Sequence, residues 1–411
     1  MENVFCVKIK HMNILLVSSK YMPEYSGAGY RAHNLYKRLS PGNPDIKLTV
    51  LCGSETENDC MKYVHEGVAV NRIACKQYPL LDSGIVRRWQ NLCNFHSECS
   101  ETKKFLASLQ AKPEIVHVFG QNYVTVTAID YAVRNRIPLI IELVTDLESP
   151  FQYVPFPLKY FFKTRPTDSF TFVCISEKLR DMCRATGISD EYIWCRPNPV
   201  DEMKFKPAPA EKKCELRRKL TKFTGPDKLI SYIAKYRPSK NQKFLVEVMK
   251  HLPGEFKLFM KGPLVKDGPL ERRDNAYFNE TAELVNRFGL SDRIQAEEGF
   301  CENIGEYYQM SDAYAFPSES EGLGTPILES VASGTPVVAN RISGVTDVWI
   351  HDGENGYLSD LEPASFAKKI ILASELSGQR MRMESEKILK VAGTEIIDSA
   401  YADLIKKYKF L

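Results

Sequence analysis

Two glutamates, Glu321 and Glu329, lie eight residues apart and flank a short turn that is rich in glycine. The residues between them that open the next helical stretch are, in order, Gly322, Leu323, Gly324 and Thr325. Thr325 suits the N-cap of a helix, and Pro326 suits its first turn. The free N–H groups and the dipole of a helix N-terminus attract an anion such as phosphate, and glycines let the backbone come close to it.

The two carboxylates beside this turn indicate a ligand that also carries hydroxyl groups. A carboxylate is badly placed to bind phosphate, but it accepts hydrogen bonds from the O–H groups of a sugar or a ribose. Together, the turn and the glutamates favour a ligand with both phosphate and sugar parts. The alternative is an ordinary strand–turn–helix connection with a capped helix and solvated glutamates.

Two lysines, Lys235 and Lys240, follow another apolar run at residues 229–234. Two cations at the end of a strand can neutralise the charge of an anionic ligand. Lysine is a point charge that lacks the planar fork of arginine, but Arg237 lies between the two lysines and could compensate. The alternative is a run of solvated charges.

The spacing of apolar residues predicts strands that alternate with helices along the chain. The expected strands of the first half span residues 13–18, 46–51, 68–73, 115–119, 139–144, 170–175 and 192–196. Those of the second half span residues 229–234, 257–260, 293–296, 313–316 and 336–339. This alternation predicts mainly parallel sheets with helices on both faces, so the fold class is α/β.

Residues 197–227 separate the two halves, and five prolines among many charges mark this stretch as a linker. The glycine turn after residues 313–316 then lies at the carboxyl end of a strand, where open α/β sheets bind ligands. A last amphipathic helix is expected from residue 395 to the end of the chain. His117, on an apolar strand, is expected to be a core histidine with hydrogen-bond partners.

The chain has 411 residues, a net charge of +3 and 11 cysteines. This length favours two domains. The small net charge and the lack of a basic patch argue against a nucleic-acid partner. The cysteines show no C-x-x-C pair and no zinc-ligand spacing with histidine, so we expect reduced thiols and no metal site. No apolar run could span a bilayer and no signal peptide is evident, so we expect a cytoplasmic protein.

The string from Pro317 to Val338, P-S-x-x-E-G-x-G-x-P-x-x-E-x-x-A-x-G-x-P-V-V, resembles the donor-site signature of glycosyltransferase family 4. Glu321 and Glu329 match the E-x7-E motif of that family. The resemblance covers nearly the whole chain and implies the GT-B fold, two Rossmann-like domains facing across a cleft. Residues 1–200 would bind the acceptor, residues 201–394 the donor, and the helix at 395–411 would pack back onto the first domain.

The resemblance also implies the reaction and the site. The enzyme would move a sugar from a UDP- or GDP-sugar to a glycan, lipid-linked or small-molecule acceptor, with retention at the anomeric carbon and without a metal or other cofactor. Lys235, Lys240 and the backbone of residues 322–325 would hold the diphosphate. Glu329 would bind the ribose, and Glu321 the transferred sugar. Two glycine turns would also contact the donor, namely Gly27 with Gly29, and Gly262.

The chain departs from the family pattern in two places. Lys235 stands where the family has arginine, and Asp146 follows a strand after which many members have a histidine. Asp146 could orient a sugar hydroxyl or the acceptor, or it could cap the next segment. These departures keep an alternative open, a catalytically impaired protein of the same fold that binds or regulates. Another enzyme on this fold, such as an epimerase or a phosphorylase, is a third interpretation.

The sequence does not identify the acceptor. In residues 151–165, however, aromatic side chains alternate with Lys159, Lys163 and Arg165. This pattern suits an interfacial contact with anionic lipid, at the inner face of the cytoplasmic membrane. The alternative is a packed helix that covers the wall of the cleft.

Overall fold

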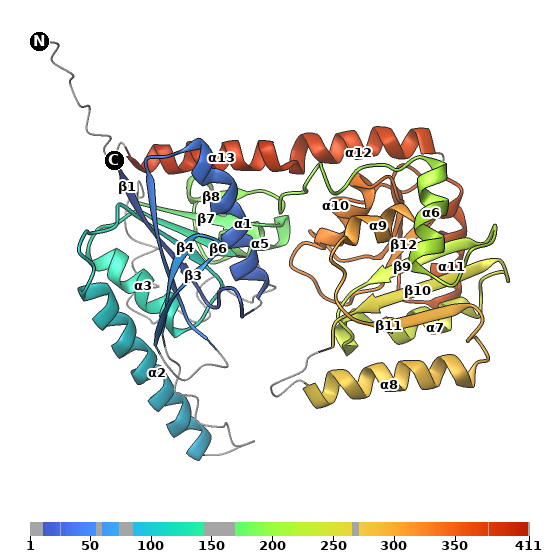
Figure 1. The fold of residues 1–411 in the computed structure, drawn as a ribbon, viewed down its shortest axis with the longest axis horizontal. Helices are drawn as coiled ribbons and strands as arrows, with labels where there is room; N and C mark the ends of the chain where they lie inside the picture. Colours follow the sequence, from blue (N-terminus) through green and yellow to red (C-terminus); the bar gives the residue numbers. More distant parts are fainter. Residues whose placement is uncertain are drawn as a thin grey trace, which may run out of the picture. The chain divides into compact units, whose positions relative to one another are not determined.

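The computed structural model describes residues 11–24, 26–54, 60–73, 85–143, 169–264, 271–376 and 378–409. The chain divides into two compact units (Figure 1). Unit 1 comprises Met1–Ile175, Leu179–Arg196 and Asp398–Leu411, and unit 2 comprises Ser176–Lys178 and Pro197–Ile397. The roles expected for residues 1–200 and 201–394 stay predictions.

Unit 1 is built on an eight-stranded sheet with the order β3-β4-β2-β1-β5-β6-β7-β8. Its strands are β1 Met12–Ser18, β2 Ile46–Cys52, β3 Met61–His65, β4 Val68–Arg72, β5 Ile115–Phe119, β6 Leu139–Leu143, β7 Phe170–Cys174 and β8 Ile193–Cys195. All neighbours pair in parallel except β3 and β4, which form an antiparallel hairpin at the edge. Parallel strands require crossover helices, and these cover both faces.

The helices of unit 1 are α1 Gly27–Gly42, α2 Ile85–Ala107, α3 Tyr123–Arg134, α5 Glu177–Ala185 and the larger part of α13 Thr394–Lys409. Helices α2 and α3 pack against each other, and α3 lies on β1 and β5. An ion pair joins α13 to α1. Arg38 of α1 donates from Nε and Nη2 to the two carboxylate oxygens of Asp398, at 2.6 and 2.9 Å. The end of the chain is thereby part of the first unit.

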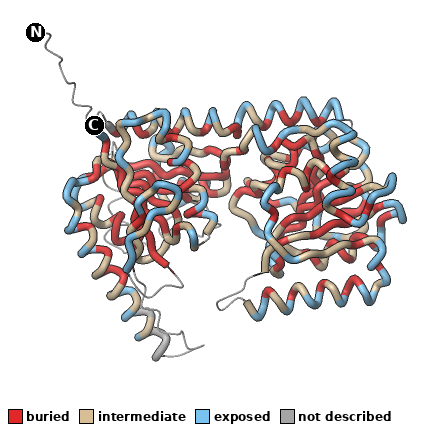
Figure 2. Tube along the Cα trace, viewed as in Figure 1, coloured by how far each residue is buried: buried red, intermediate tan, exposed pale blue. Residues whose placement is uncertain are grey.

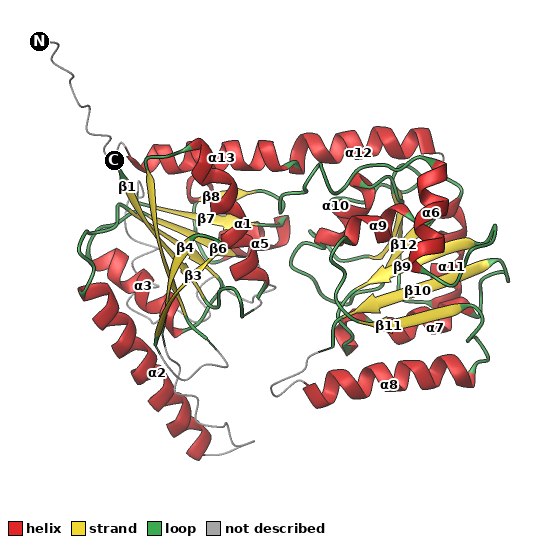
Figure 3. Cartoon of the chain, viewed as in Figure 1, coloured by secondary structure: helices red, strands yellow, loops and turns green. Residues whose placement is uncertain are grey.

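Unit 2 is built on a six-stranded sheet with the order β11-β10-β9-β12-β13-β14, and every neighbouring pair is parallel. Its strands are β9 Lys228–Ile233, β10 Phe256–Gly262, β11 Ile294–Glu298, β12 Ala313–Phe316, β13 Val337–Asn340 and β14 Gly356–Ser359. Two layers of helices cover this sheet (Figure 3). One layer comprises α7 Gln242–Met249, α8 Glu271–Arg287 and α11 Pro363–Ser374, and the other comprises α6 Ala210–Leu220, α9 Ile304–Gln309, α10 Thr325–Ala332 and α12 Gly378–Ala392.

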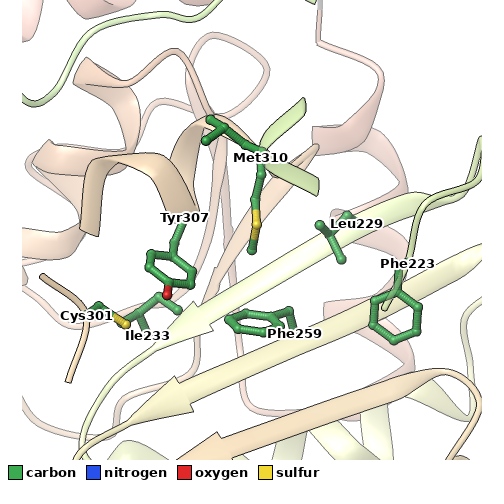
Figure 4. Packing of buried hydrophobic residues seen from close by; sticks show 8 residues of the cluster. Phe223, Leu229, Ile233, Phe259, Cys301, Tyr307 and Met310 are labelled. Carbon is green, nitrogen blue, oxygen red and sulfur yellow. The ribbon is translucent and has the colours of Figure 1, made fainter. Parts of the chain in front are cut away.

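Both units have a core made by the strands and by the inner faces of the helices (Figure 2). In unit 2 one apolar cluster joins α6, β9, β10 and α9 (Figure 4). Phe259 of β10 stacks on Tyr307 of α9 with ring centroids 5.6 Å apart, and Leu216 of α6 is fully buried in the same cluster. This packing fixes β9 and β10, whose carboxyl ends carry candidate site residues.

The sequence predicted the alternation correctly but missed three elements. Strands β3 and β14 were not expected, because each is short and lacks a clear apolar period. Helix α6 lies inside the stretch taken for a linker, so that interpretation was wrong for residues 210–220. Within the described residues, no helix is both long and apolar enough to cross a membrane.

Candidate functional site

The candidate site of unit 2 lies where the strand order of its sheet reverses. The chain runs from β9 outward to β10 and β11, then returns to β12 on the other side of β9. The loops that follow β9 and β12 leave the carboxyl ends of these strands in opposite directions. Doubly wound sheets bind ligands at such a point. Residues 234–241 follow β9 and residues 317–324 follow β12, so both predicted segments meet at this point.

Hydrogen bonds hold the two loops together. The Glu319 N–H donates to the Ser239 carbonyl at 3.1 Å. The hydroxyl of the fully buried Tyr232 donates to the Lys240 carbonyl at 2.7 Å and lies 3.2 Å from the Ser318 hydroxyl. Burial raises the pKa of Tyr232 well above its usual range, so the phenol keeps its proton and remains a donor. Sequence reasoning missed this tyrosine because a strand residue gives no local sign of a contact across loops.

Lys240 and Glu321 form an ion pair across the two loops, with the Lys240 ammonium donating to the Glu321 carboxylate. Both side chains are only partly exposed, 27% for the lysine and 14% for the glutamate. The structure therefore brings together two residues that the sequence assigned to the diphosphate and to the sugar. Because Lys240 is already paired with Glu321, an anionic ligand must compete with Glu321 for Lys240.

The other cations of this edge are arranged differently. Lys235 is exposed at the end of β9, and its carbonyl accepts from the Gln242 side-chain amide at 2.9 Å, which holds the turn. Arg237 donates to Asp274 of α8 at 3.4 Å. Arg237 is therefore directed to a fully buried carboxylate that it shares with Arg273.

Helix α10 begins one residue earlier than the sequence indicated. Its N-cap is Gly324, which has a φ of 75°, and Thr325 is the first helical residue, so the prediction of Thr325 as N-cap was wrong. The left-handed conformation suits glycine, which has no Cβ. The Thr325 hydroxyl accepts instead from the Asn198 amide at 2.8 Å. No side chain caps the N-terminus of α10, so its amide groups face the loop without a side-chain acceptor.

A glycine cap closes the far end of α10. Gly334 has a φ of 79°. The N–H of Gly334 donates to the Val331 carbonyl at 2.9 Å, and the N–H of Thr335 donates to the Ser330 carbonyl at 3.0 Å. This pair of bonds is the Schellman arrangement, which satisfies the last carbonyls of the helix. Helix α10 is thus held at a defined length, with Glu329 in its second turn.

Glu329 is the most perturbed carboxyl group near the site. Burial raises its pKa to about 7, and a hydrogen bond from the Tyr308 hydroxyl to Oε2 at 2.9 Å opposes that rise. Tyr308 is itself fully buried on α9. The sequence singled out Glu329 but not Tyr308, because their contact depends on the packing of α9 against α10. A carboxyl group held in this way can accept ligand hydroxyls at little further desolvation cost.

Gly262 marks a close approach of two strand ends. A Cβ atom at Gly262 would lie 1.8 Å from the Ala234 carbonyl oxygen, so only glycine lets the end of β10 lie against the end of β9. Its carbonyl accepts from the Gly299 N–H at 3.0 Å. The predicted contact of this turn with a nucleobase stays a prediction.

The glycines of unit 1 belong to the first turn of α1. The helix begins at Gly27, because Ser26 caps it by accepting from the Gly29 N–H at 2.9 Å. A Cβ atom at Gly29 would lie 2.4 Å from the Lys20 carbonyl oxygen, whereas Gly27 faces open space. Asp146, with Thr145, lies outside the described residues, as does the segment 151–165.

His117 is a core histidine, as the sequence predicted. It is fully buried, with Tyr36 2.8 Å from Nδ1 and Glu142 3.1 Å from Nε2. Glu142 also accepts from Arg196 at 2.9 Å and from the Tyr401 hydroxyl at 2.5 Å. Burial lowers the pKa of His117, so the ring is neutral near pH 7. This network joins α1, β5, β6 and α13 and stabilises unit 1.

The two doubly wound units define the class of the protein, two Rossmann-like α/β units with the GT-B architecture, which confirms the predicted fold class. Solved structures of that class superpose over nearly the whole chain. A HepE structure from Anabaena in complex with UDP and glucose has a TM-score of 0.71 at 17% identity, covering 96% of this chain and 100% of that one. Sucrose-phosphate synthase from Thermosynechococcus elongatus has a TM-score of 0.72 at 15% identity, covering 97% and 99%.

The model of the family Glycosyl transferases group 1 matches residues 213–389, which lie in unit 2. This confirms the resemblance found in the sequence. A sulfoquinovosyl transferase of Arabidopsis thaliana is 24% identical over 318 residues, which are 72% of this chain and 58% of that protein. A D-inositol 3-phosphate glycosyltransferase of Xylanimonas cellulosilytica is 28% identical over 212 residues, 50% of this chain and 49% of that protein. The chain therefore spans about half the length of these curated relatives.

Proposed function

We propose that this protein is a glycosyltransferase that takes a sugar from a nucleoside-diphosphate sugar. The observation that carries the proposal is the Lys240–Glu321 ion pair at the switch point of the unit 2 sheet. Its glutamate lies in the loop that leads into the uncapped N-terminus of α10. A cation, a carboxylate and free backbone donors match the diphosphate and the sugar of such a donor. The match of residues 213–389 to a glycosyltransferase family model and the likeness in fold to a UDP-bound structure support this proposal.

Donor binding would exchange the partners of the ion pair. The diphosphate takes over Lys240, joined by Lys235 and the N-terminus of α10, and Glu321 is released to accept hydrogen bonds from the sugar. Each charged group then keeps a partner, so the exchange avoids leaving a desolvated charge alone. The positive groups stabilise the negative charge that develops on the leaving diphosphate. Because they supply this charge, the proposed reaction needs no metal ion.

Glu329 would accept hydrogen bonds from the ribose. Its carboxyl group is already desolvated and retains the proton up to about pH 7. A ribose hydroxyl that donates to Glu329 needs a lone pair on the carboxylate, so this contact favours the ionised form of Glu329. Donor binding therefore releases a proton from those molecules in which Glu329 is protonated. The proposed ribose contact therefore predicts coupling between pH and donor affinity.

The finer assignments are part of the same proposal. The donor base is uracil or guanine, the anomeric configuration is retained, and the acceptor is a glycan, a lipid-linked molecule or a small molecule. Gly27 and Gly29 on unit 1 contact the phosphate or the sugar of the donor, and Gly262 lies near its base. Asp146 orients a hydroxyl group. An acceptor in anionic lipid would place the protein at the inner face of the cytoplasmic membrane.

A thermal-shift screen against UDP- and GDP-sugars tests the donor, because a ligand that binds only the folded state raises the melting temperature. Release of nucleoside diphosphate then measures turnover, and we expect it to persist after chelation with EDTA. Glu321→Ala should lose turnover by about 100-fold, the range seen when a charge-stabilising group is removed. Glu319→Ala, an exposed glutamate of the same loop, is the matched control.

Two results would change the proposal. If no nucleotide sugar or nucleoside diphosphate shifts the melting temperature, the donor site is wrong. If a donor binds but neither hydrolysis nor transfer occurs with any acceptor, the protein is the impaired binding or regulatory member of the family. The lysine at position 235, in place of arginine, favours this second function, since a point charge stabilises a diphosphate less well than a planar fork.

A further inference from the structure

Three side chains with metal-ligating atoms meet on unit 1, and none of them is a residue assigned to the donor. They are His33 of α1, His65 at the end of β3, and Glu66 in the turn between β3 and β4. One nitrogen of each histidine and one oxygen of the glutamate lie within 4.8 Å of one another. The cluster therefore joins the edge hairpin of the sheet to the helix beneath it.

The hairpin turn holds Glu66 in an unusual conformation. His65 pairs with Val68, so the connection has only two residues, Glu66 and Gly67. Their φ angles are 45° and 82°, as in the type I′ turn that suits the twist of a hairpin. Glycine tolerates this conformation, but a glutamate with positive φ is uncommon and strained. The strained residue is the one whose carboxylate faces His33.

His33 is oriented as metal-binding histidines are. Its ring is buried, Nδ1 lies 3.0 Å from the Tyr21 hydroxyl, and Nε2 lies 3.2 Å from Glu66 Oε2. When Nδ1–H donates to Tyr21, Nε2 carries the lone pair that a metal needs. The Tyr21 hydroxyl oxygen can accept this hydrogen bond, which would fix the orientation of the ring. The His65 ring contacts His33 edge to face, with centroids 5.0 Å apart.

We propose that His33, His65 and Glu66 form a zinc-binding site with water as the fourth ligand. In tetrahedral zinc with bonds of about 2.0–2.1 Å, neighbouring ligand atoms are roughly 3.3 Å apart. The His33–Glu66 distance of 3.2 Å already matches this separation. His65 approaches by side-chain rotation, since its ligand atom lies within 4.8 Å of the others. The bound ion clamps the β3–β4 hairpin onto α1.

Lys37 competes with the metal ion for the carboxylate. It lies one turn after His33, and its ammonium donates to the same Glu66 Oε2 at 2.5 Å. Zinc would therefore have to displace this ammonium group from the Glu66 carboxylate. The Lys37 side chain is 58% exposed and is free to turn into solvent when zinc binds. Removing Lys37 should therefore tighten zinc binding rather than weaken it.

The test uses the untagged full-length protein, freed of metal by chelation and titrated with Zn²⁺ by calorimetry and with Co²⁺ by visible absorption. We expect one ion per chain and the absorption of tetrahedral Co²⁺. His65→Ala should weaken binding by about 10–100-fold, as loss of an oriented ligand does. Lys37→Met should tighten it. His251→Ala, an exposed histidine of unit 2, is the control and should leave the affinity unchanged.

Several outcomes would overturn the zinc site. These are no heat and no absorption with excess ion, equal affinity in wild type and His65→Ala, or weaker binding in Lys37→Met. In any of them, the cluster is a charge network that closes the hairpin. Because Lys37→Met keeps all three ligands, a gain of affinity supports the site even if His65→Ala fails to fold.

Discussion

Replacing Glu329 with glutamine should stabilise unit 2 at alkaline pH while weakening donor binding. Burial raises the pKa of Glu329 from 4.5 to about 7. Between these values the folded state holds a proton that the unfolded state has lost, so the free energy of unfolding decreases as pH rises from about 4.5 to 7. Each unit of pKa difference corresponds to about 1.36 kcal/mol, so the ionised carboxyl group costs roughly 3 kcal/mol above pH 7. Glutamine is isosteric and has no such cost.

The assay is urea unfolding of unit 2 at pH 5 and at pH 8. The chain has three tryptophans, and Trp349 is the one in unit 2. A Trp89→Phe, Trp194→Phe background makes its fluorescence report unit 2 alone. In that background Glu329→Gln should gain roughly 3 kcal/mol at pH 8 and roughly 1 kcal/mol at pH 5, by the same linkage relation. Glu255→Gln, an exposed glutamate of unit 2, should change little at either pH.

The reasoning would be refuted by equal stability of Glu329→Gln and its parent at pH 8, or by a gain that grows on acidification. Either result would mean that the carboxylate is well solvated in the folded protein. A gain in stability together with unchanged donor affinity would keep the desolvation argument but remove Glu329 from the ribose. The expected combination of a more stable and less active protein is typical of polar groups buried for function.

Four other outcomes follow from the same geometry. Donor affinity of the wild type should fall as pH decreases below about 7, because Glu329 must lose its proton to accept ribose hydroxyls, and calorimetry should show this dependence vanish in Glu329→Gln. Tyr308→Phe should move the affinity profile to higher pH, since the lost hydrogen bond favours the carboxylate. Lys240→Ala should lower the free energy of unfolding by less than about 1 kcal/mol, because its pair with Glu321 is partly exposed, yet turnover should drop steeply. Gly324→Ala should lower the melting temperature, with a cost of about 1–2 kcal/mol for an alanine at a φ of 75°.

The sequence also predicted where the site would lie, through features that act over a few residues. A strand of four apolar residues, a glycine turn and a helix with a glycine cap follow each other between Ala313 and Gly334. Local backbone preferences and apolar spacing determine each of these elements, so the structure has them in the predicted order. The one-residue error at Thr325 arose because Gly324 takes a left-handed conformation that serves as the cap in place of a side chain.

Contacts between distant segments escaped prediction. Tyr308 and Glu329 are 21 residues apart and meet because α9 packs against α10. The Tyr232 hydroxyl, which donates to the Lys240 carbonyl after β9, also contacts the Ser318 hydroxyl after β12, and these two strands are neighbours only because the strand order reverses. Helix α6 was taken for a linker because its surface is highly charged and only Leu216 is fully buried against the core.

The amino-acid sequence by itself determined the α/β class, the resemblance to glycosyltransferases and the position of the glutamates along the chain, because short-range spacing encodes them. Only the tertiary structure decided that Lys240 pairs with Glu321, that Glu329 is desolvated beside Tyr308, and that two histidines and a glutamate converge on unit 1. The physical reason is that charge, burial and proton affinity depend on which atoms are close in space. Residues far apart in the chain supply those atoms, and no local pattern records them.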